Sequence, residues 1–175
     1  MTDMPFTQAF AQWIALLRYQ LVEKDDVWVV TDLGETTYYV HHDGSSYTLN
    51  ETQCSHNEDF LMSGEDIADA ERYLTRLMGS PIRSLRDLPF IRHAWKPSDI
   101  RPGWSAVKSY PHWVLRDPHG RERAAFYDSD SAVLFSWIAG MNVDDIRASY
   151  LDPDGLPLFP GCWIGPVKPD PVIQN

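Results

Sequence analysis

Two histidines and an aspartate in the second half of the chain have the side-chain types of a hydrolytic site. His112, Asp117 and His119 lie close together in the sequence, and imidazole and carboxylate groups can act as general acids and bases. Such a site also needs a nucleophile, and no serine or cysteine stands in a recognisable nucleophile turn. The sequence has neither a phosphate-cradling glycine loop nor a dinucleotide-binding motif. We therefore expect no catalytic residue, no cofactor and no enzymatic activity, with a hydrolase using these three residues as an alternative.

A second group has the side-chain types of metal ligands. Cys54, His56, Glu58 and Asp59 lie within one short segment, and their sulfur, nitrogen and oxygen atoms could surround an ion. Zinc sites usually combine two separated ligand pairs, and the sequence offers no second Cys/His pair. We expect a solvated acidic loop here and no metal.

The segment LDPDGLPLFPG, from Leu151 to Gly161, superficially suggests calcium ligands. An EF-hand loop needs a glutamate seven residues after its glycine, but Cys162 stands seven residues after Gly155. Proline at the second position and glycine at the fourth fit a type I turn over residues 152–155. We expect a turn that ends a helix and sends a tail, residues 152–175, along the surface.

The elements of the first half must position these side chains. Apolar residues at helical spacing predict an amphipathic helix over residues 5–22. Three β-branched and aromatic segments, residues 27–32, 36–42 and 45–52, then predict an antiparallel meander. Ser63 resembles the N-cap of a further helix that Gly79 and Pro81 would end.

The second half repeats this order. Residues 104–109, 112–117 and 121–128 predict three more strands, and residues 131–140 and 142–150 predict two helices, the latter capped by Asn142. The fold class is therefore α+β, with two antiparallel three-stranded units that are each followed by helix. At 175 residues the chain is expected to form one domain, residues 1–175, with halves at 27–92 and 104–151.

Some residues of the two halves match at fixed offsets, which raises the hypothesis of an internal duplication with pseudo-two-fold symmetry. Tyr39, Val40 and Asp43 match Trp113, Val114 and Asp117 at one offset. Gly79, Leu85 and Arg86 match Gly140, Ile146 and Arg147 at another. The change of offset places extra residues in the first half, around Glu58 and Asp59.

Composition limits the classes of partner. The formal charge of −10 argues against nucleic acid and anionic membranes, which both favour a basic surface, and it would steer a basic protein partner. No segment approaches the length of a membrane span, and no leader pattern is present at the N-terminus. Cys54 and Cys162 could form one bridge or remain free thiols. We expect a cytoplasmic protein.

Several segments resemble a family of actinobacterial immunity proteins for polymorphic toxins, the group that contains the immunity factor for tuberculosis necrotizing toxin. They are NVDDIRASYLDPDGLPLF, the preceding GRERAAFYDSDSAVLFSWIAG, and ERYLTRLMGSPIRSL in the first half. The resemblance spans roughly residues 5–160. It implies a cytoplasmic antitoxin that binds a cognate secreted toxin and blocks the toxin's active site. For the necrotizing toxin, the blocked activity is hydrolysis of NAD. The resemblance carries over no toxin-contacting residue.

We therefore expect a non-enzymatic immunity protein that binds the folded catalytic domain of its toxin, in a 1:1 complex. The alternative from another class is an acidic secretion chaperone, which would bind an unfolded or N-terminal segment of an exported client. Both functions require a protein-binding surface and both fit an acidic chain.

Two segments without regular pattern are candidates for that surface. The segment RHAWKPSDIRPGW contains Trp95 as a possible anchor, with a polar rim of Lys96, Asp99 and Arg101. The other candidate is the extra loop of the first half with Glu58 and Asp59. The alternative is that Trp95 fills a seam between the halves and both loops are inert.

Overall fold

The structure is a computed structural model that describes residues 6–32, 34, 36–54, 57–92, 96–159 and 163–165. Eight strands form one antiparallel sheet in the order β1-β2-β3-β4-β5-β9-β8-β7, and β6 pairs with β10 in a second small sheet. The strands are β1 Gln20–Lys24, β2 Val27–Thr31, β3 Thr36–His42, β4 Tyr47–Gln53, β5 Asp59–Gly64, β6 Phe90–Arg92, β7 Ser105–Ser109, β8 His112–Arg116, β9 Glu122–Phe126 and β10 Trp163–Gly165.

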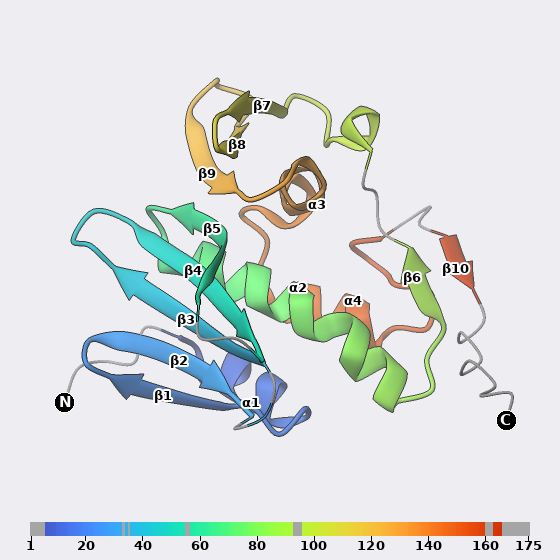
Figure 1. The fold of residues 1–175 in the computed structure, drawn as a ribbon. Coiled ribbons are helices and arrows are strands. Elements are labelled where there is room, and N and C mark those ends of the chain that lie inside the picture. The colour runs from blue at the N-terminus through green and yellow to red at the C-terminus, as the bar shows by residue number, and fades with distance from the viewer. Residues whose placement is uncertain are drawn as a thin grey trace, which may run out of the picture.

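Four α-helices and a short 3₁₀ helix accompany the sheet, which confirms the predicted α+β class. They are α1 Gln8–Ala15, α2 Ile67–Leu85, η1 Pro97–Asp99, α3 Ser129–Ile138 and α4 Val143–Leu151. Helices α2 and α4 pack against each other beside the first five strands, and α3 packs against β7, β8 and β9 (Figure 1). Buried side chains from Phe6 to Phe159 form a cluster that includes residues of both halves.

The predicted helix over residues 5–22 is too long. Helix α1 ends at Ala15, and residues 20–24 form β1, in which Leu21 pairs with Val30 of β2. Asp25 and Asp26 form the two-residue turn between these strands with φ of 53° and 63°. Such turns usually contain glycine or asparagine, so the sequence carries no obvious hairpin signal here.

Helix α2 differs from its prediction at both ends. Asp66 caps it, since its side chain accepts a hydrogen bond from the amide of Ala68, whereas Ser63 lies in β5. The helix continues through Gly79 and Pro81 to Leu85. A Cβ atom at Gly79 would overlap the ring of Tyr150 in α4. Gly79 therefore serves close packing between two helices and does not end one.

The predicted three-stranded units, each followed by helix, recur with additions in the first half. Strands β1 and β5 extend the first meander, which leads into α2, while β7, β8 and β9 lead into α3. A two-fold axis between the paired strands β5 and β9 would relate β4 to β8 and β3 to β7. The sequence match of Tyr39 with Trp113 joins β3 to β8 instead, so it does not connect equivalent strands.

Residues 152–159 of the predicted surface tail are largely exposed, but they are tied to the core at several points. Arg83 of α2 is 2% exposed, and its guanidinium donates to the carbonyl oxygens of Pro89, Tyr150, Asp152 and Pro153. The amide of Gly155 donates to the carbonyl of Asp152, which confirms the turn, and Phe159 packs against Tyr150. The remaining part of the predicted tail contains few described residues.

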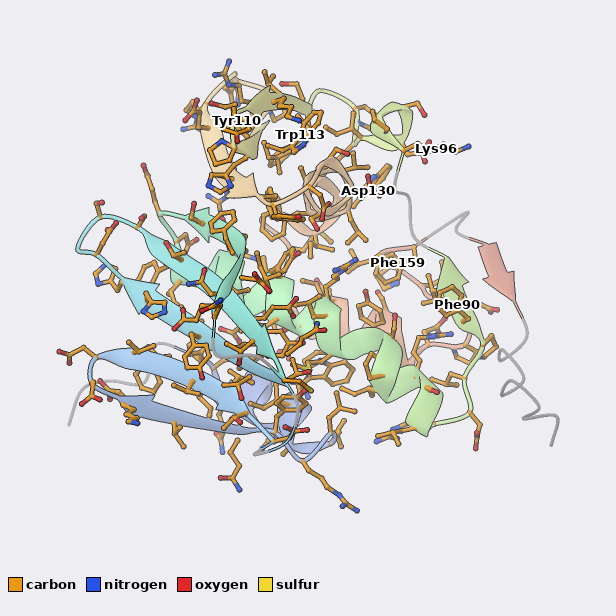
Figure 2. The ribbon with its side chains drawn as sticks, in the orientation of Figure 1. Phe90, Lys96, Tyr110, Trp113, Asp130 and Phe159 are labelled. Atoms are coloured by element: carbon orange, nitrogen blue, oxygen red, sulfur yellow. The ribbon has the colours of Figure 1, made fainter. Side chains whose placement is uncertain are left out.

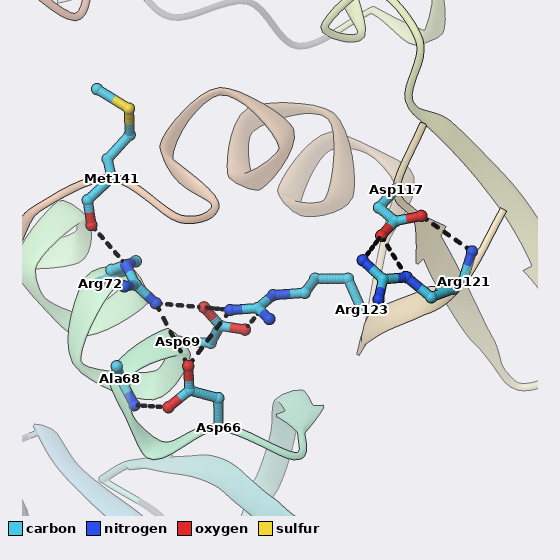
Figure 3. Close-up of polar contacts among 8 residues, drawn as sticks. All are labelled: Asp66, Ala68, Asp69, Arg72, Asp117, Arg121, Arg123 and Met141. Atoms are coloured by element: carbon cyan, nitrogen blue, oxygen red, sulfur yellow. Dashed lines mark hydrogen bonds and ion pairs between the residues drawn. The ribbon is translucent and has the colours of Figure 1, made fainter. Parts of the chain in front are cut away.

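An ion cluster joins α2 of the first half to β9 of the second (Figure 3). The carboxylate of Asp69 in α2 is fully buried and lies 2.7 Å from Arg72 of the same helix and 2.7 Å from Arg123 of β9. Arg72 also donates to the carbonyl of Met141, between α3 and α4. A buried carboxylate is tolerated because two guanidinium groups compensate it.

Candidate protein-binding surface

The sheet has one face that the described helices leave uncovered. Cross-strand partners Val40, Leu49, Met62 and Phe126 are each at most 1% exposed and lie on the face that packs against the helices. Their neighbours along the strands point the other way because side chains alternate. We call that other side the helix-free face. Its central residues are Tyr39, His41, Thr48, Asn50, Phe60, Ser63, Val107, His112, Val114, Ala125 and Tyr127, and the charged side chains of Lys24, Arg116 and Glu122 lie farther out on it.

Aromatic and imidazole rings are prominent on the helix-free face. Tyr39 stacks on His41 with ring centroids 6.3 Å apart, and Phe60 contacts His112 at 4.1 Å. Tyr127, just beyond β9, is 67% exposed. Tyr110, at the β7–β8 turn, is 91% exposed (Figure 2). Exposed aromatic side chains in one region are typical of surfaces that bind other proteins.

Glu58 provides a charge on this face. Its Oε2 atom accepts a hydrogen bond from Nδ2 of Asn50 over 2.7 Å and lies 2.7 Å from Nε2 of His41. Burial acts to raise the pKa of Glu58, but these hydrogen bonds outweigh burial and hold the pKa below its usual value. The carboxylate is therefore ionised at neutral pH, held in place from β3 and β4, and still 34% exposed.

Glu58 and Asp59 were predicted as members of one loop, but strand geometry separates them. Asp59 begins β5 and lies opposite Glu51 of β4, whereas Glu58 contacts Asn50, the preceding residue of β4. Neighbouring strand residues point to opposite faces, so the two acidic side chains diverge. The extra segment of the first half is thus partly a central strand of the sheet, which the sequence reading missed.

The second predicted segment lies on the other side of the sheet, against α3. The amide of Arg101 donates to Oγ of Ser136, and Nε1 of Trp137 donates to the carbonyl of Asp99. Lys96 is exposed beside this helix (Figure 2). Because α3 packs on the covered face, this segment and Glu58 do not form one continuous surface. Trp95, the predicted anchor, lies outside the described residues.

The predicted catalytic and metal candidates do not converge in the described residues. His112 begins β8 and Asp117 follows its end, and a strand advances about 3.3 Å per residue. The carboxylate of Asp117 accepts hydrogen bonds from the amides of His119 and Arg121, which fixes the turn. Within the described residues no group of three or more His, Cys, Asp or Glu side chains could hold a metal ion. His56 and Cys162 lie outside them, and Cys54 is a free, exposed thiol.

Sequence reasoning missed most residues of the helix-free face. The alternation in residues 36–42 predicts that Tyr39 and His41 share a side of a strand. It could not show that His112, over seventy positions away, lies on the same face, because that depends on the pairing of β5 with β9.

Comparisons with known proteins give one consistent result. The model of the family described as immunity protein 61 matches residues 13–158. The immunity factor for TNT of Mycobacterium tuberculosis and its homologue in Mycobacterium bovis are each 26% identical over 137 residues, covering 72% of this chain and 73% of theirs. The solved structure of Rv3902c from M. tuberculosis superposes with a TM-score of 0.81 at 23% identity, covering 91% of this chain and 96% of the other. No helix in the described parts of the chain is long and apolar enough to cross a membrane.

Proposed function

Because this chain belongs to the immunity protein 61 family, we propose that it binds a cognate toxin, blocks the toxin's active site and so protects the cell that produces it. The match of the family model over residues 13–158 carries this proposal. Two relatives that cover most of the chain are named as immunity factors, which supports the same role.

The proposed mechanism is occlusion of a substrate cleft and involves no turnover by this chain. A formal charge of −10 suits a toxin whose cleft is basic enough to hold a phosphate-bearing substrate. The relatives are named as immunity factors for TNT. The resemblance seen in the sequence links that toxin, tuberculosis necrotizing toxin, to hydrolysis of NAD. We therefore propose an NAD-hydrolysing toxin as the partner. The complex would form in the cytoplasm with the folded catalytic domain, one molecule to one.

The first test identifies the partner. The full chain, tagged and expressed in its native cell, is used to capture bound proteins, which mass spectrometry then identifies. The toxin found in this way is produced as a separate catalytic domain and mixed with this protein. We expect co-elution in gel filtration and loss of the toxin's activity. A toxin that stays active when bound would contradict occlusion.

The same materials distinguish the secretion chaperone. An immunity protein binds the folded catalytic domain, whereas a chaperone binds an unfolded or N-terminal segment of its client. We expect the isolated catalytic domain, checked for its own activity before mixing, to bind as tightly as the complete toxin. Binding that requires the client's N-terminal segment would favour the chaperone.

A further inference from the structure

We propose that the helix-free face is the surface that holds the toxin, and that Glu58 is its polar anchor for an arginine or lysine side chain of the toxin. This inference rests on the proposed function and adds the surface and the chemistry of the contact.

Glu58 is prepared for such a contact before the partner arrives. His41 and Asn50 hold its carboxylate through one oxygen, Oε2, at 2.7 Å each. Side chains that are fixed in advance lose little conformational entropy on binding. The remaining carboxylate surface is partly exposed on the helix-free face, where an incoming guanidinium or ammonium group could reach it.

The surroundings of Glu58 favour a charged contact that excludes water. On the same face, Tyr39 of β3 stacks on His41, and Phe60 of β5 lies opposite Asn50 of β4, so each ring adjoins a partner of the carboxylate. Of the other charged side chains that strand register places on this face, Lys24 lies in the outermost strand and Arg116 is paired with Glu122. An ionised acid with aromatic side chains on the adjoining strands matches the anatomy of an interface core.

The backbone of this face favours a folded partner. Six strands, β2, β3, β4, β5, β9 and β8, have a neighbour on both sides, so their backbone hydrogen-bonding groups are directed within the sheet. An extended peptide that adds as a strand would need one of the edges, β1 or β7. Recognition of the helix-free face therefore depends on its side chains, which suits a folded surface better than an added strand. The acidity of the whole chain makes a cationic surface the complementary one.

The test uses the catalytic domain of the toxin recovered by the capture experiment and measures its dissociation constant with three variants of the full chain. Glu58→Gln removes the charge but keeps the size of the side chain. Tyr127→Ala truncates an exposed ring of the same face, 67% exposed, so folding should be preserved. Asp130→Asn, on the exposed side of α3, removes the same charge from elsewhere and serves as the control (Figure 2).

We expect Glu58→Gln to weaken binding by about 30-fold and to lessen its dependence on salt, since one charged contact is lost. Tyr127→Ala should weaken binding by about 10-fold, and Asp130→Asn should bind like the original chain. Unchanged binding by both Glu58→Gln and Tyr127→Ala, while the original chain still inhibits the toxin, would overturn the proposed surface and leave the function intact. A change in the oligomeric state of the free protein on Tyr127→Ala would also overturn it, because a second copy would then occupy this face. If the original chain fails to inhibit the toxin, the proposed function fails and this inference with it.

Discussion

Three aspartates at the ends of strands and helices are held in place by hydrogen bonds from backbone amides that follow them in the chain. Each carboxylate accepts from two amides that lie two to four residues further along. Asp43 accepts from Ser45 and Ser46, Asp117 from His119 and Arg121, and Asp152 from Asp154 and Leu156. In the sequence, Asp117 between two histidines raised the possibility of catalysis, and the segment that begins at Asp152 suggested calcium ligands. Their hydrogen bonds are instead those of turns, in which short acidic side chains replace a backbone carbonyl.

Asp43 should make the stability of the protein sensitive to acid. Backbone and hydroxyl hydrogen bonds from Ser45 and Ser46 hold the pKa of Asp43 far below its usual value. The folded state therefore keeps this carboxylate ionised where the unfolded chain, with a pKa of about 3.9, takes up a proton. The stability that Asp43 contributes is complete above about pH 4 and is lost progressively as the pH falls further.

Urea unfolding of the original chain and of Asp43→Asn across this range measures that contribution. The difference in free energy of unfolding between the two should be constant near neutral pH and should shrink below about pH 4. A titration of the Asp43 carboxyl followed by ¹³C NMR measures its pKa in the folded protein independently. Parallel pH profiles for the two proteins would show that Asp43 titrates as it does in the unfolded chain.

At the scale of elements, strands with clear alternation were predicted well and elements fixed by distant contacts were not. Residues 27–31, 36–42 and 112–116 are strands as expected. Strand β1 was read as helix because Leu17 and Leu21 continue the spacing of α1, although Leu21 pairs with β2. Strand β5 was read as a loop because it begins with Asp59 after Glu58, a pattern typical of an exposed loop, although the strand lies between β4 and β9. Local pattern cannot reveal partners that are far away in the sequence.

Gly79 provides a test of how α2 and α4 pack. In an isolated helix, replacement of glycine by alanine stabilises by about 1 kcal/mol. Here the added methyl group would overlap the ring of Tyr150, which is fully buried. We expect Gly79→Ala to lower the free energy of unfolding by about 1–3 kcal/mol, because the helices must move apart.

Chemical denaturation measures this effect, with Ser84→Ala at an exposed position of the same helix as the control. The cost of Gly79→Ala should be smaller in a Tyr150→Ala background, where the overlapping ring is absent. A stabilised Gly79→Ala variant would mean that α2 and α4 are not in such close contact.

For the whole molecule, the pairing of β5 with β9 is what creates the candidate surface. It places Tyr39 and Glu58 of the first half on one face with His112 and Tyr127 of the second. The fold class followed from the sequence, because each strand and helix has its own pattern. The surface did not, because it exists only after strands from both halves have joined in one sheet.

The ion cluster at this junction should be necessary for stability. Asp69→Ala would remove the buried carboxylate that Arg72 and Arg123 share and leave them only the longer contacts with Asp66, at a cost of about 3 kcal/mol. Arg121→Ala, which breaks an exposed pair with Asp117, should cost at most about 1 kcal/mol (Figure 3). Thermal and urea unfolding of the two variants allow the comparison. Equal, small losses would show that the buried cluster does not hold the halves together.

A titration of the toxin's catalytic domain with the full chain, at a concentration far above the dissociation constant, tests whether this protein inhibits the toxin by occupying its active site. Toxin activity should fall linearly with added protein and reach zero near one equivalent. Residual activity at saturating excess, in a complex that gel filtration shows to be intact, would mean that the protein binds the toxin without blocking its active site.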